Sequence, residues 1–269
     1  MKLRNKRTIY ATILGIYLIF TFLPIYWMTI TALKPKSEIT RTLTYYPHRF
    51  TLENFAKAFT EPLWMNALKN SLLISCGSVT LCLMVGICAA YAFSRYTFIG
   101  DKHFFFWLIT NRMAPPAVFV IPYFMIYTTI GLFDTILAII LSHTLFNLPL
   151  AIWLLVGFMN AVPKDLDEAA FVDGYSFVRY FRKILLPVIA PGIGVTAFFL
   201  FLFSWSELLL GSVLTAASAK PVTVALLQSV SMAGIDWGLI AAVSTLAVLP
   251  GVVFVVFVRK YIARGFLAG

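Results

Sequence analysis

The amino-acid sequence predicts an all-α membrane protein with six transmembrane helices, on three observations. Of the 269 residues, 61% are hydrophobic and only 12% are charged, and the mean hydropathy is +0.89, whereas soluble proteins average roughly 45–50% apolar and about 25% charged residues. Six runs are nearly free of charge and long enough to cross a bilayer. One polar segment, between the fourth and fifth runs, carries the signals of two short helices. This composition excludes a disordered chain and argues against a soluble globular domain.

The six apolar runs define the predicted spans, because a helix rising about 1.5 Å per residue needs roughly 20 residues to cross about 30 Å of hydrocarbon. They lie in a single domain, 1–269, at residues 10–33, 70–94, 104–130, 135–162, 188–210 and 237–258. The first run is too long for a signal peptide and is followed by Lys34 and Lys36 rather than by a cleavage site, so we expect it to remain as an anchor. The third run is the most interrupted, by Asn111, Arg112, Pro115, Pro116 and Pro122.

The three cysteines all fall in the second span, at Cys76, Cys82 and Cys88. A spacing of six residues matches neither paired metal ligands nor a redox Cys-x-x-Cys motif. We therefore expect them to be small apolar residues on a buried face of that helix.

The distribution of Lys and Arg predicts the orientation, because cytoplasmic loops of membrane proteins carry an excess of these residues. With the N-terminus inside, thirteen cations lie in inner segments and seven in outer segments, and Arg112 lies within a span. Both termini are therefore predicted to be cytoplasmic. Because the cations flank apolar runs, the net charge of +10 indicates contact with anionic lipid head groups rather than with nucleic acid.

The outer segment at residues 34–69 is predicted to form a small folded cap over the membrane. Within it, Thr51 is a candidate N-cap, and Glu53 and the apolar residues that follow have the spacing of a short amphipathic helix. Such a helix either covers the ends of the spans or provides a docking site for a partner.

The inner segment at residues 163–187 predicts a helix, a turn and a second helix. Pro163 suits the first position of a helix, and acidic residues follow it in the first turns, where the helix dipole favours negative charge. Gly174 is a natural left-handed stop, Ser176 can cap the second helix, and Pro187 is expected to break the chain before the fifth span. A surface helix with two adjacent alanines allows close approach of a partner, so this hairpin is shaped to enter a groove of another protein.

The same segment resembles the EAA signature of permease subunits of ABC importers that use a separate substrate-binding protein. Every specified position of that signature is matched at full spacing, by Glu168, Ala169, Ala170, Gly174, Ile184, Leu186 and Pro187. The resemblance covers most of the chain and is strongest to the carbohydrate-uptake branch, in particular to the second permease of maltose-type systems. Where that family often has Trp-Asn-Glu, this chain has Trp205, Ser206 and Glu207, and the family's usual Gly-rich, Lys-containing tail extends several residues beyond the position of Gly269.

The resemblance implies a type I ABC importer permease fold, multi-pass in a bacterial inner membrane. The helix around Glu168 would be a coupling helix seated in a cleft of a cytoplasmic ATPase, with Glu168 pairing with a polar or basic group, Ala169 and Ala170 packing there, and Gly174 making the bend. Asp173, which precedes Gly174 in the signature, is also implied to belong to the coupling region. The implied partners are a second permease in a heterodimer, an ABC ATPase dimer and a periplasmic or lipid-anchored binding protein. The implied cofactors, ATP and Mg²⁺, would be bound by the ATPase, because this chain has no Gly-x-x-x-x-Gly-Lys-Ser/Thr motif.

Polar residues within the spans are candidates for the substrate pathway, because such residues are costly in lipid and should face protein or water. Arg112, roughly 12 Å into the third span, either contacts substrate or a gate together with Asn111 or pairs with a carbonyl freed by the nearby prolines. Glu207 lies closer to the outer face, so an Arg112–Glu207 pair would need strong tilt and is not expected.

The fifth span ends on a group that could bind a sugar or polyol by stacking and hydrogen bonding, namely Trp205, Ser206 and Glu207. The alternative for this group is an interfacial Trp anchor beside an acid that lines the helix bundle. Asn147 in the fourth span serves either the pathway or helix-to-helix bonding. His143 is surrounded by apolar residues in the sequence and is expected to be a packed histidine rather than a ligand.

Two other classes of function remain as alternatives. An ATP-independent secondary transporter would show an inverted repeat between the halves of the chain, and none is evident. An intramembrane enzyme would need a catalytic motif such as Gly-x-Ser-x-Gly or His-Glu-x-x-His, and the sequence contains neither. The expected function is transport of a sugar, polyol or glycerol-like substrate by a subunit that is not itself an enzyme.

Overall fold

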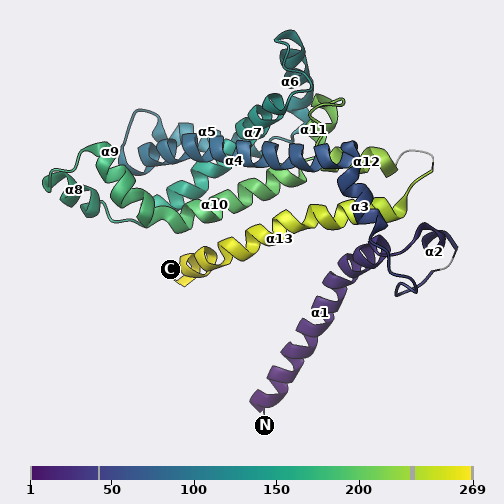
Figure 1. The fold of residues 1–269 in the computed structure, drawn as a ribbon. Helices are drawn as coiled ribbons and strands as arrows, with labels where there is room; N and C mark the ends of the chain where they lie inside the picture. The colour runs from purple at the N-terminus through teal and green to yellow at the C-terminus, as the bar shows by residue number, and fades with distance from the viewer. Residues whose placement is uncertain (1, 42, 231–233, 268–269) are drawn as a thin grey trace. The chain divides into compact units, whose positions relative to one another are not determined.

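The computed structural model describes residues 2–41, 43–230 and 234–267, with side chains for 10–41, 43–230 and 234–259, and these residues form helices and no strand (Figure 1). The helices are α1 (Lys2–Ala32), α2 (Lys36–Arg41), α3 (Glu53–Thr60), α4 (Pro62–Arg95), α5 (Asp101–Met113), α6 (Ala117–Thr129), α7 (Ile136–Asn160), α8 (Asp165–Val172), α9 (Phe177–Tyr180), α10 (Leu186–Ser206), α11 (Leu209–Leu214), α12 (Val222–Val230) and α13 (Trp237–Leu267). Their contacts form two compact units, one of residues up to 66 with 225–250 and one of 67–224 with the residues from 251. Each unit is described by itself.

Five helical segments of the described chain are long and apolar enough to span a membrane, and a bent pair brings the number up to six. The segments are Tyr10–Ala32, Pro62–Arg95, Ile136–Asn160, Phe177–Ser206 and Trp237–Arg259, and the bent pair is α5 with α6. The interrupted third run therefore folds as two helices, because α5 and α6 meet at 93°. Ala114 at the break is extended, as expected for a residue that precedes the two prolines 115 and 116.

The fifth span begins and ends at places other than those predicted. Pro187 does not break the chain, because a π-helical turn over Phe181–Leu185 joins α9 to α10, and Pro187 lies in the first turn of α10, where a missing N–H costs little. The helix stops at Ser206, and Glu207 is extended with ψ 131°. Residues 207–210 therefore lead into a separate short helix, α11, rather than completing the span.

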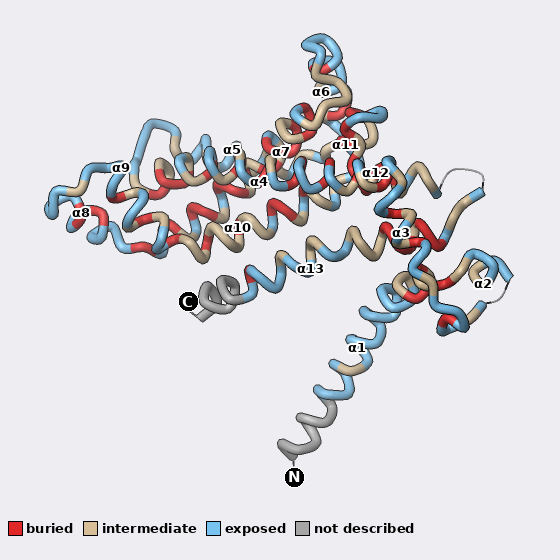
Figure 2. Tube along the Cα trace, viewed as in Figure 1, coloured by how far each residue is buried: buried red, intermediate tan, exposed pale blue. Residues whose placement is uncertain are grey.

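The core of the larger unit lies where α4, α7 and α10 pack against one another (Figure 2). Leu155 and Met159 of α7 and Ala90 of α4 are fully buried there. Of the three cysteines, only Cys82 is buried, and Cys76 and Cys88 are exposed. A six-residue spacing turns a helix by about 240°, so three such residues point in different directions and the prediction of a shared buried face is wrong.

The close approach of α10 to α7 depends on Gly192. A β-carbon at this position would lie 2.3 Å from the ring of Phe158, so we expect Gly192→Ala to force the helices apart and to destabilise the folded state by about 1–3 kcal/mol. Gly157→Ala, on α7 next to Phe158, is a matched control because a β-carbon there would enter open space, with no atom of a neighbouring segment within 4 Å. Thermal unfolding in detergent should show a lower midpoint for Gly192→Ala alone, and equal midpoints would refute the close packing.

One end of the larger unit is organised by Asp134, which precedes α7 and has a left-handed backbone with φ 57°. Its carboxylate accepts hydrogen bonds of 2.9–3.1 Å from the backbone N–H groups of residues 216–219. On α4, the Asn70 amide donates to the carbonyls of Ser218 and Lys220, and the Ser71 hydroxyl accepts from the N–H of Val222. The loop between α11 and α12 is thus fixed to α4 at Asn70 and Ser71 and to the start of α7.

Protonation of Asp134 is expected to release this loop. Burial raises the pKa of Asp134, but the four N–H donors outweigh it and hold the pKa at about 2, below the ordinary 3.8. The stabilisation is therefore complete above about pH 4 and is lost as the pH falls through about 2. At neutral pH, Asp134→Ala should reduce amide-exchange protection at 216–219 about tenfold, since the carboxylate is partly exposed. Asp134→Asn tolerates the left-handed backbone and should lose less of this protection. Unchanged amide exchange in both variants would contradict the prediction.

The smaller unit contains α1 and the short helices α2 and α3, which lie in the segment predicted to form a cap, whereas residues 62–69 of that segment begin α4. The apolar side chains of α1 are mostly exposed (Figure 2), as expected for a helix that faces lipid. The Thr51 hydroxyl accepts from the N–H of Glu53 at the start of α3, and buried Asn54 donates to the carbonyls of Ala32 and Lys34. The backbone N–H of His48, with further donors, lowers the pKa of Glu38 to about 2. These bonds give the cap a fixed structure.

Candidate coupling helix and transport pathway

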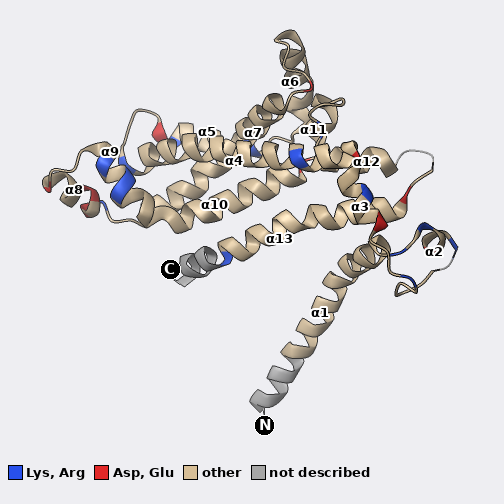
Figure 3. Cartoon of the chain, in the orientation of Figure 1, with Lys and Arg blue, Asp and Glu red and all other residues tan. Residues whose placement is uncertain are grey.

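The segment between α7 and α10 folds as the predicted helical hairpin, with α8 and α9 joined by a tight turn. Gly174 has φ 80°, the left-handed conformation predicted for it, and the N–H of Asp173 closes α8 on the carbonyl of Ala169. Ser176 occupies the N-cap position of α9, without a side-chain capping bond. Acidic side chains lie on α8 and basic ones at α9 and the following turn (Figure 3). The hairpin therefore has opposite charges on its two arms.

The two faces of α8 have different surroundings. Glu168 and Ala169 are exposed, and the Glu168 carboxylate has no hydrogen bond or ion pair with any described residue. Ala170, by contrast, is 4% exposed and packs in the core of the larger unit with Leu185. The expectation that both alanines pack against a partner is therefore wrong for Ala170, because its own chain already covers it.

The other predicted coupling residues are divided in the same way. Asp173, Gly174 and Pro187 are exposed, whereas Ile184 and Leu186 are half-buried and pack against the core. A partner can thus reach the N-terminal half of the signature and its turn. The hydrophobic residues in the C-terminal half fix the hairpin to the helix bundle.

A second candidate site is a cavity of about 210 Å³ within the larger unit. It is lined by Arg112, Pro116, His143, Phe146, Asn147, Phe203, Ser206, Glu207 and Leu210. These residues come from the bend between α5 and α6, from one face of α7, from the end of α10 and from the start of α11. On α7, the cavity begins about 10 Å along the axis from Ile136 and ends at about 16 Å. It therefore lies at membrane depth.

Arg112 is the basic group of this cavity. Its guanidinium lies 4.3 Å from the ring centroid of Phe146 and 4.9 Å from that of Phe203, distances typical of cation–π contacts. Among the described residues it has no hydrogen-bond acceptor, so it does not bond to a carbonyl freed by the prolines. No ion pair joins it to Glu207, in agreement with the prediction, although both residues line the cavity. Its N–H donors are available to a ligand.

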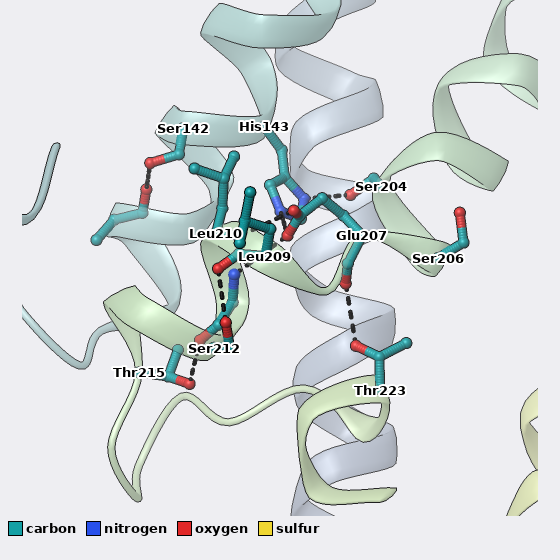
Figure 4. A network of polar contacts seen from close by, with 12 residues as sticks. Ser142, His143, Ser204, Ser206, Glu207, Leu209, Leu210, Ser212, Thr215 and Thr223 are labelled. Atoms are coloured by element: carbon teal, nitrogen blue, oxygen red, sulfur yellow. Dashed lines mark hydrogen bonds and ion pairs between the residues drawn. The ribbon is translucent and has the colours of Figure 1, made fainter. Parts of the chain in front are cut away.

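Glu207 is the acidic group of the cavity, and His143 lies beside it (Figure 4). The carboxylate accepts hydrogen bonds from the N–H groups of Leu210 and Gly211 at the start of α11, at 2.8 and 3.1 Å. His143 Nε2 lies 3.4 Å from Glu207 Oε2, and His143 Nδ1 lies 2.7 Å from the Ser204 hydroxyl. Glu207 thus caps a helix, contacts His143 and faces the cavity at the same time.

The structure brings four of the six predicted pathway residues together, namely Arg112, Asn147, Ser206 and Glu207. Asn147 is 3% exposed, and its Oδ1 has no hydrogen-bond partner among the described residues. Asn111 does not line the cavity and donates to the carbonyl of Trp107. Trp205 does not line it either, because its ring stacks on Phe201 at 5.5 Å.

His143 is the titratable cavity residue that the sequence interpretation missed, and the apolar lining by Phe146 and Phe203 was not predicted either. It is buried, as predicted for a packed histidine, but it contacts two polar side chains rather than apolar ones alone. Its position four residues before Asn147 was the available signal, because residues four apart share one face of a helix.

Residues 83–267 match the family model described as binding-protein-dependent transport system inner membrane component. The chain is 31% identical to the diacetylchitobiose uptake system permease protein DasC of Streptomyces coelicolor, over 96% of this chain and 94% of the relative. It is 34% identical to the trehalose transport system permease protein SugB of Mycobacterium tuberculosis, over 98% and 97%. Its fold matches a chain of the crystal structure of a bacterial ABC transporter involved in alginate import, with TM-score 0.82, 19% identity and 96% of each chain covered.

The matched region contains α8, the cavity and most of the helix bundle. The relatives are permease proteins, and the family's function is transport across a membrane. The chain therefore belongs to the family of binding-protein-dependent transport system inner membrane components, as an integral permease subunit of an ABC importer rather than an enzyme.

Proposed function

We propose that this chain imports a sugar, polyol or glycerol-like substrate and contacts it in the cavity beside Arg112. The observation that carries the proposal is the cavity's chemistry: Arg112 offers N–H donors, Asn147 and Glu207 offer oxygen acceptors, and Phe146 and Phe203 supply apolar surface. Hydroxyl groups on an apolar ring skeleton match such a lining. The relatives named for diacetylchitobiose, trehalose and trehalose/maltose transport support this class.

The size of the cavity favours one sugar ring or a small polyol in contact with this chain at a time. Its volume of about 210 Å³ is below the roughly 300–1,000 Å³ typical of pockets for drug-sized ligands. The formal charges of Arg112 and Glu207 cancel, which favours an uncharged substrate. Other parts of a longer substrate would contact the second permease, with which this chain would form a heterodimer.

The proposed energy source is ATP hydrolysis with Mg²⁺ on a dimer of a separate cytoplasmic ATPase, into which α8 docks through Glu168, Ala169 and the turn at Gly174. A periplasmic or lipid-anchored binding protein would deliver the substrate. ATP would drive the cycle by binding more tightly to one conformation of the assembly than to the other. The matched family and its relatives support this assembly.

Both termini are proposed to be cytoplasmic, together with α8 and α9. The excess of Lys and Arg on the corresponding side supports this orientation. It can be tested by labelling single cysteines at positions 169 and 217 with a membrane-impermeant maleimide, after Cys76, Cys82 and Cys88 are replaced. Position 217 should react in intact cells and position 169 only after lysis, and the reverse pattern would overturn the proposal.

The function can be tested with the complex purified from native cells through a tag on this chain. Reconstituted vesicles would be supplied with ATP and with a panel of trehalose, maltose, diacetylchitobiose, glycerol and a neutral amino acid. We expect ATP-dependent accumulation of at least one carbohydrate or glycerol. Accumulation of the amino acid alone would refute the substrate class, and accumulation without ATP would favour a secondary transporter.

A further inference from the structure

A buried ion pair joins α8 to the end of α4. Arg95, the last residue of α4, places its Nε 2.6 Å from Asp167 Oδ2 and its Nη2 3.4 Å from Asp167 Oδ1. The side chains are only 5% and 9% exposed. A charged pair this well buried is costly to desolvate and is favourable only when its remaining donors and acceptors are also satisfied.

Further hydrogen bonds meet part of this requirement and bring in two more segments, while Arg95 Nε contacts Asp167 as an ion pair without hydrogen-bond geometry. Arg95 Nη1 donates to the carbonyl of Met159 at 3.3 Å, and Nη2 donates to that of Val162 at 3.2 Å. These carbonyls lie at and just beyond the C-terminal end of α7, where backbone acceptors lack helical partners. The hydroxyl of Tyr180 on α9, a fully buried residue, donates to Asp167 Oδ1. One guanidinium and one carboxylate thus connect four segments.

The position of Asp167 links this network to the exposed face of α8. It directly precedes Glu168, so one face of α8 is fixed to the helix bundle while the adjacent face, with Glu168 and Ala169, is exposed. A force applied to the exposed face reaches α4 and α7 through the rigid planar fork of Arg95, and it reaches α9 and the continuous α10 through Tyr180.

We infer that the network of Arg95, Asp167 and Tyr180 transmits movement of α8 to the membrane helices, and that these three are positioning residues for transport. This inference rests on the proposed docking of α8 on an ATPase. If this network were weakened, α8 would follow the ATPase without moving the membrane helices. ATP hydrolysis would then continue while import declines, which is a signature that a purely structural contact would not give.

The test uses the purified complex in vesicles and measures copurified ATPase, ATP hydrolysis and import of the carbohydrate that the wild type accumulates. Tyr180→Phe removes one hydroxyl and keeps the buried ring, and Asp167→Asn removes the charge with little change in shape. Asp165→Asn is the control, because it makes the same change on the exposed part of α8. For Tyr180→Phe and Asp167→Asn we expect wild-type ATPase content, at least half of the ATP hydrolysis and a fivefold or greater fall in import per ATP, with no change for Asp165→Asn.

Several results would overturn the inference that this network transmits movement. One is an unchanged ratio of import to ATP hydrolysis in both variants, and another is an equal fall of this ratio in Asp165→Asn. A third is loss of the ATPase or of a monodisperse complex in Tyr180→Phe, which would show that the network serves only folding or docking. Failure of the proposed function is distinguishable, because it would appear in the wild type as absence of a copurified ATPase or of ATP-dependent import.

Discussion

Glu168→Lys is expected to detach the ATPase from the permease and to reduce ATP-driven import by about 100-fold. Glu168 is exposed and its carboxylate has no partner among the described residues, so the change leaves the core of this chain intact. In the proposed assembly it brings a positive charge against a polar or basic group, and juxtaposed like charges cost several kcal/mol at an interface. The measurement is the amount of ATPase that copurifies with the tagged chain, together with import by vesicles.

Asp165→Lys is the matched control for this prediction. It reverses the same charge in the first turn of the same helix, so it reproduces any loss of helix stability that comes from the dipole. We expect it to retain most of the ATPase. If Glu168→Lys keeps a full complement of ATPase and imports at the wild-type rate, the exposed face of α8 is not the docking surface.

The sequence was a good guide to features that depend on short stretches of chain. The long apolar runs correspond to helices because lipid leaves a backbone no other way to satisfy its polar groups. The turn between α8 and α9 was predictable from Gly174 alone, because a left-handed residue is strongly favoured to be glycine. The inward face of α8 was not predictable, because the burial of Ala170 depends on the position of Leu185 and Tyr180 in the bundle.

Helix breaks were harder to predict, since a proline allows a bend without deciding whether it occurs. At Pro115 and Pro116 the chain turns by 93°, and α6 then packs on α11. At Pro187 the helix continues, because a π-helical turn precedes it. In each case the structure around the proline, rather than the proline itself, distinguishes a bend from a continuous helix.

The candidate pathway shows the same limit in its side chains. Arg112 and Glu207 were predicted to lie too far apart in depth, because both spans were treated as straight rods, whereas α10 ends at Ser206 and Glu207 turns toward α7. Trp205, predicted to contact substrate, packs against Phe201, whereas His143, predicted to be packed, lines the cavity. The direction of each side chain depends on which face of its helix meets a neighbour. Only the spacing of His143 and Asn147 carried this information in advance.

Arg112→Ala is expected to reduce import of the carbohydrate that the wild type accumulates by roughly 10- to 100-fold, the range for hydrogen bonds to a charged group. The guanidinium is held between Phe146 and Phe203 and makes no hydrogen bond within the described chain. Its removal therefore leaves no described acceptor unsatisfied, and the loss should appear in import rather than in stability. Arg112→Lys keeps the charge but not the planar fork, so its import rate should lie between those of the wild type and of Arg112→Ala.

Asn111→Ala provides the matched control, because Asn111 precedes Arg112 on α5 but donates to its own helix at Trp107 and lies outside the cavity. It should import at the wild-type rate. The thermal unfolding midpoint and the copurified ATPase should be the same in all three variants, so that a loss of import is attributable to the cavity. Wild-type import by Arg112→Ala would show that the substrate does not use this cavity, and an equal loss in Asn111→Ala would assign the effect to the packing of α5.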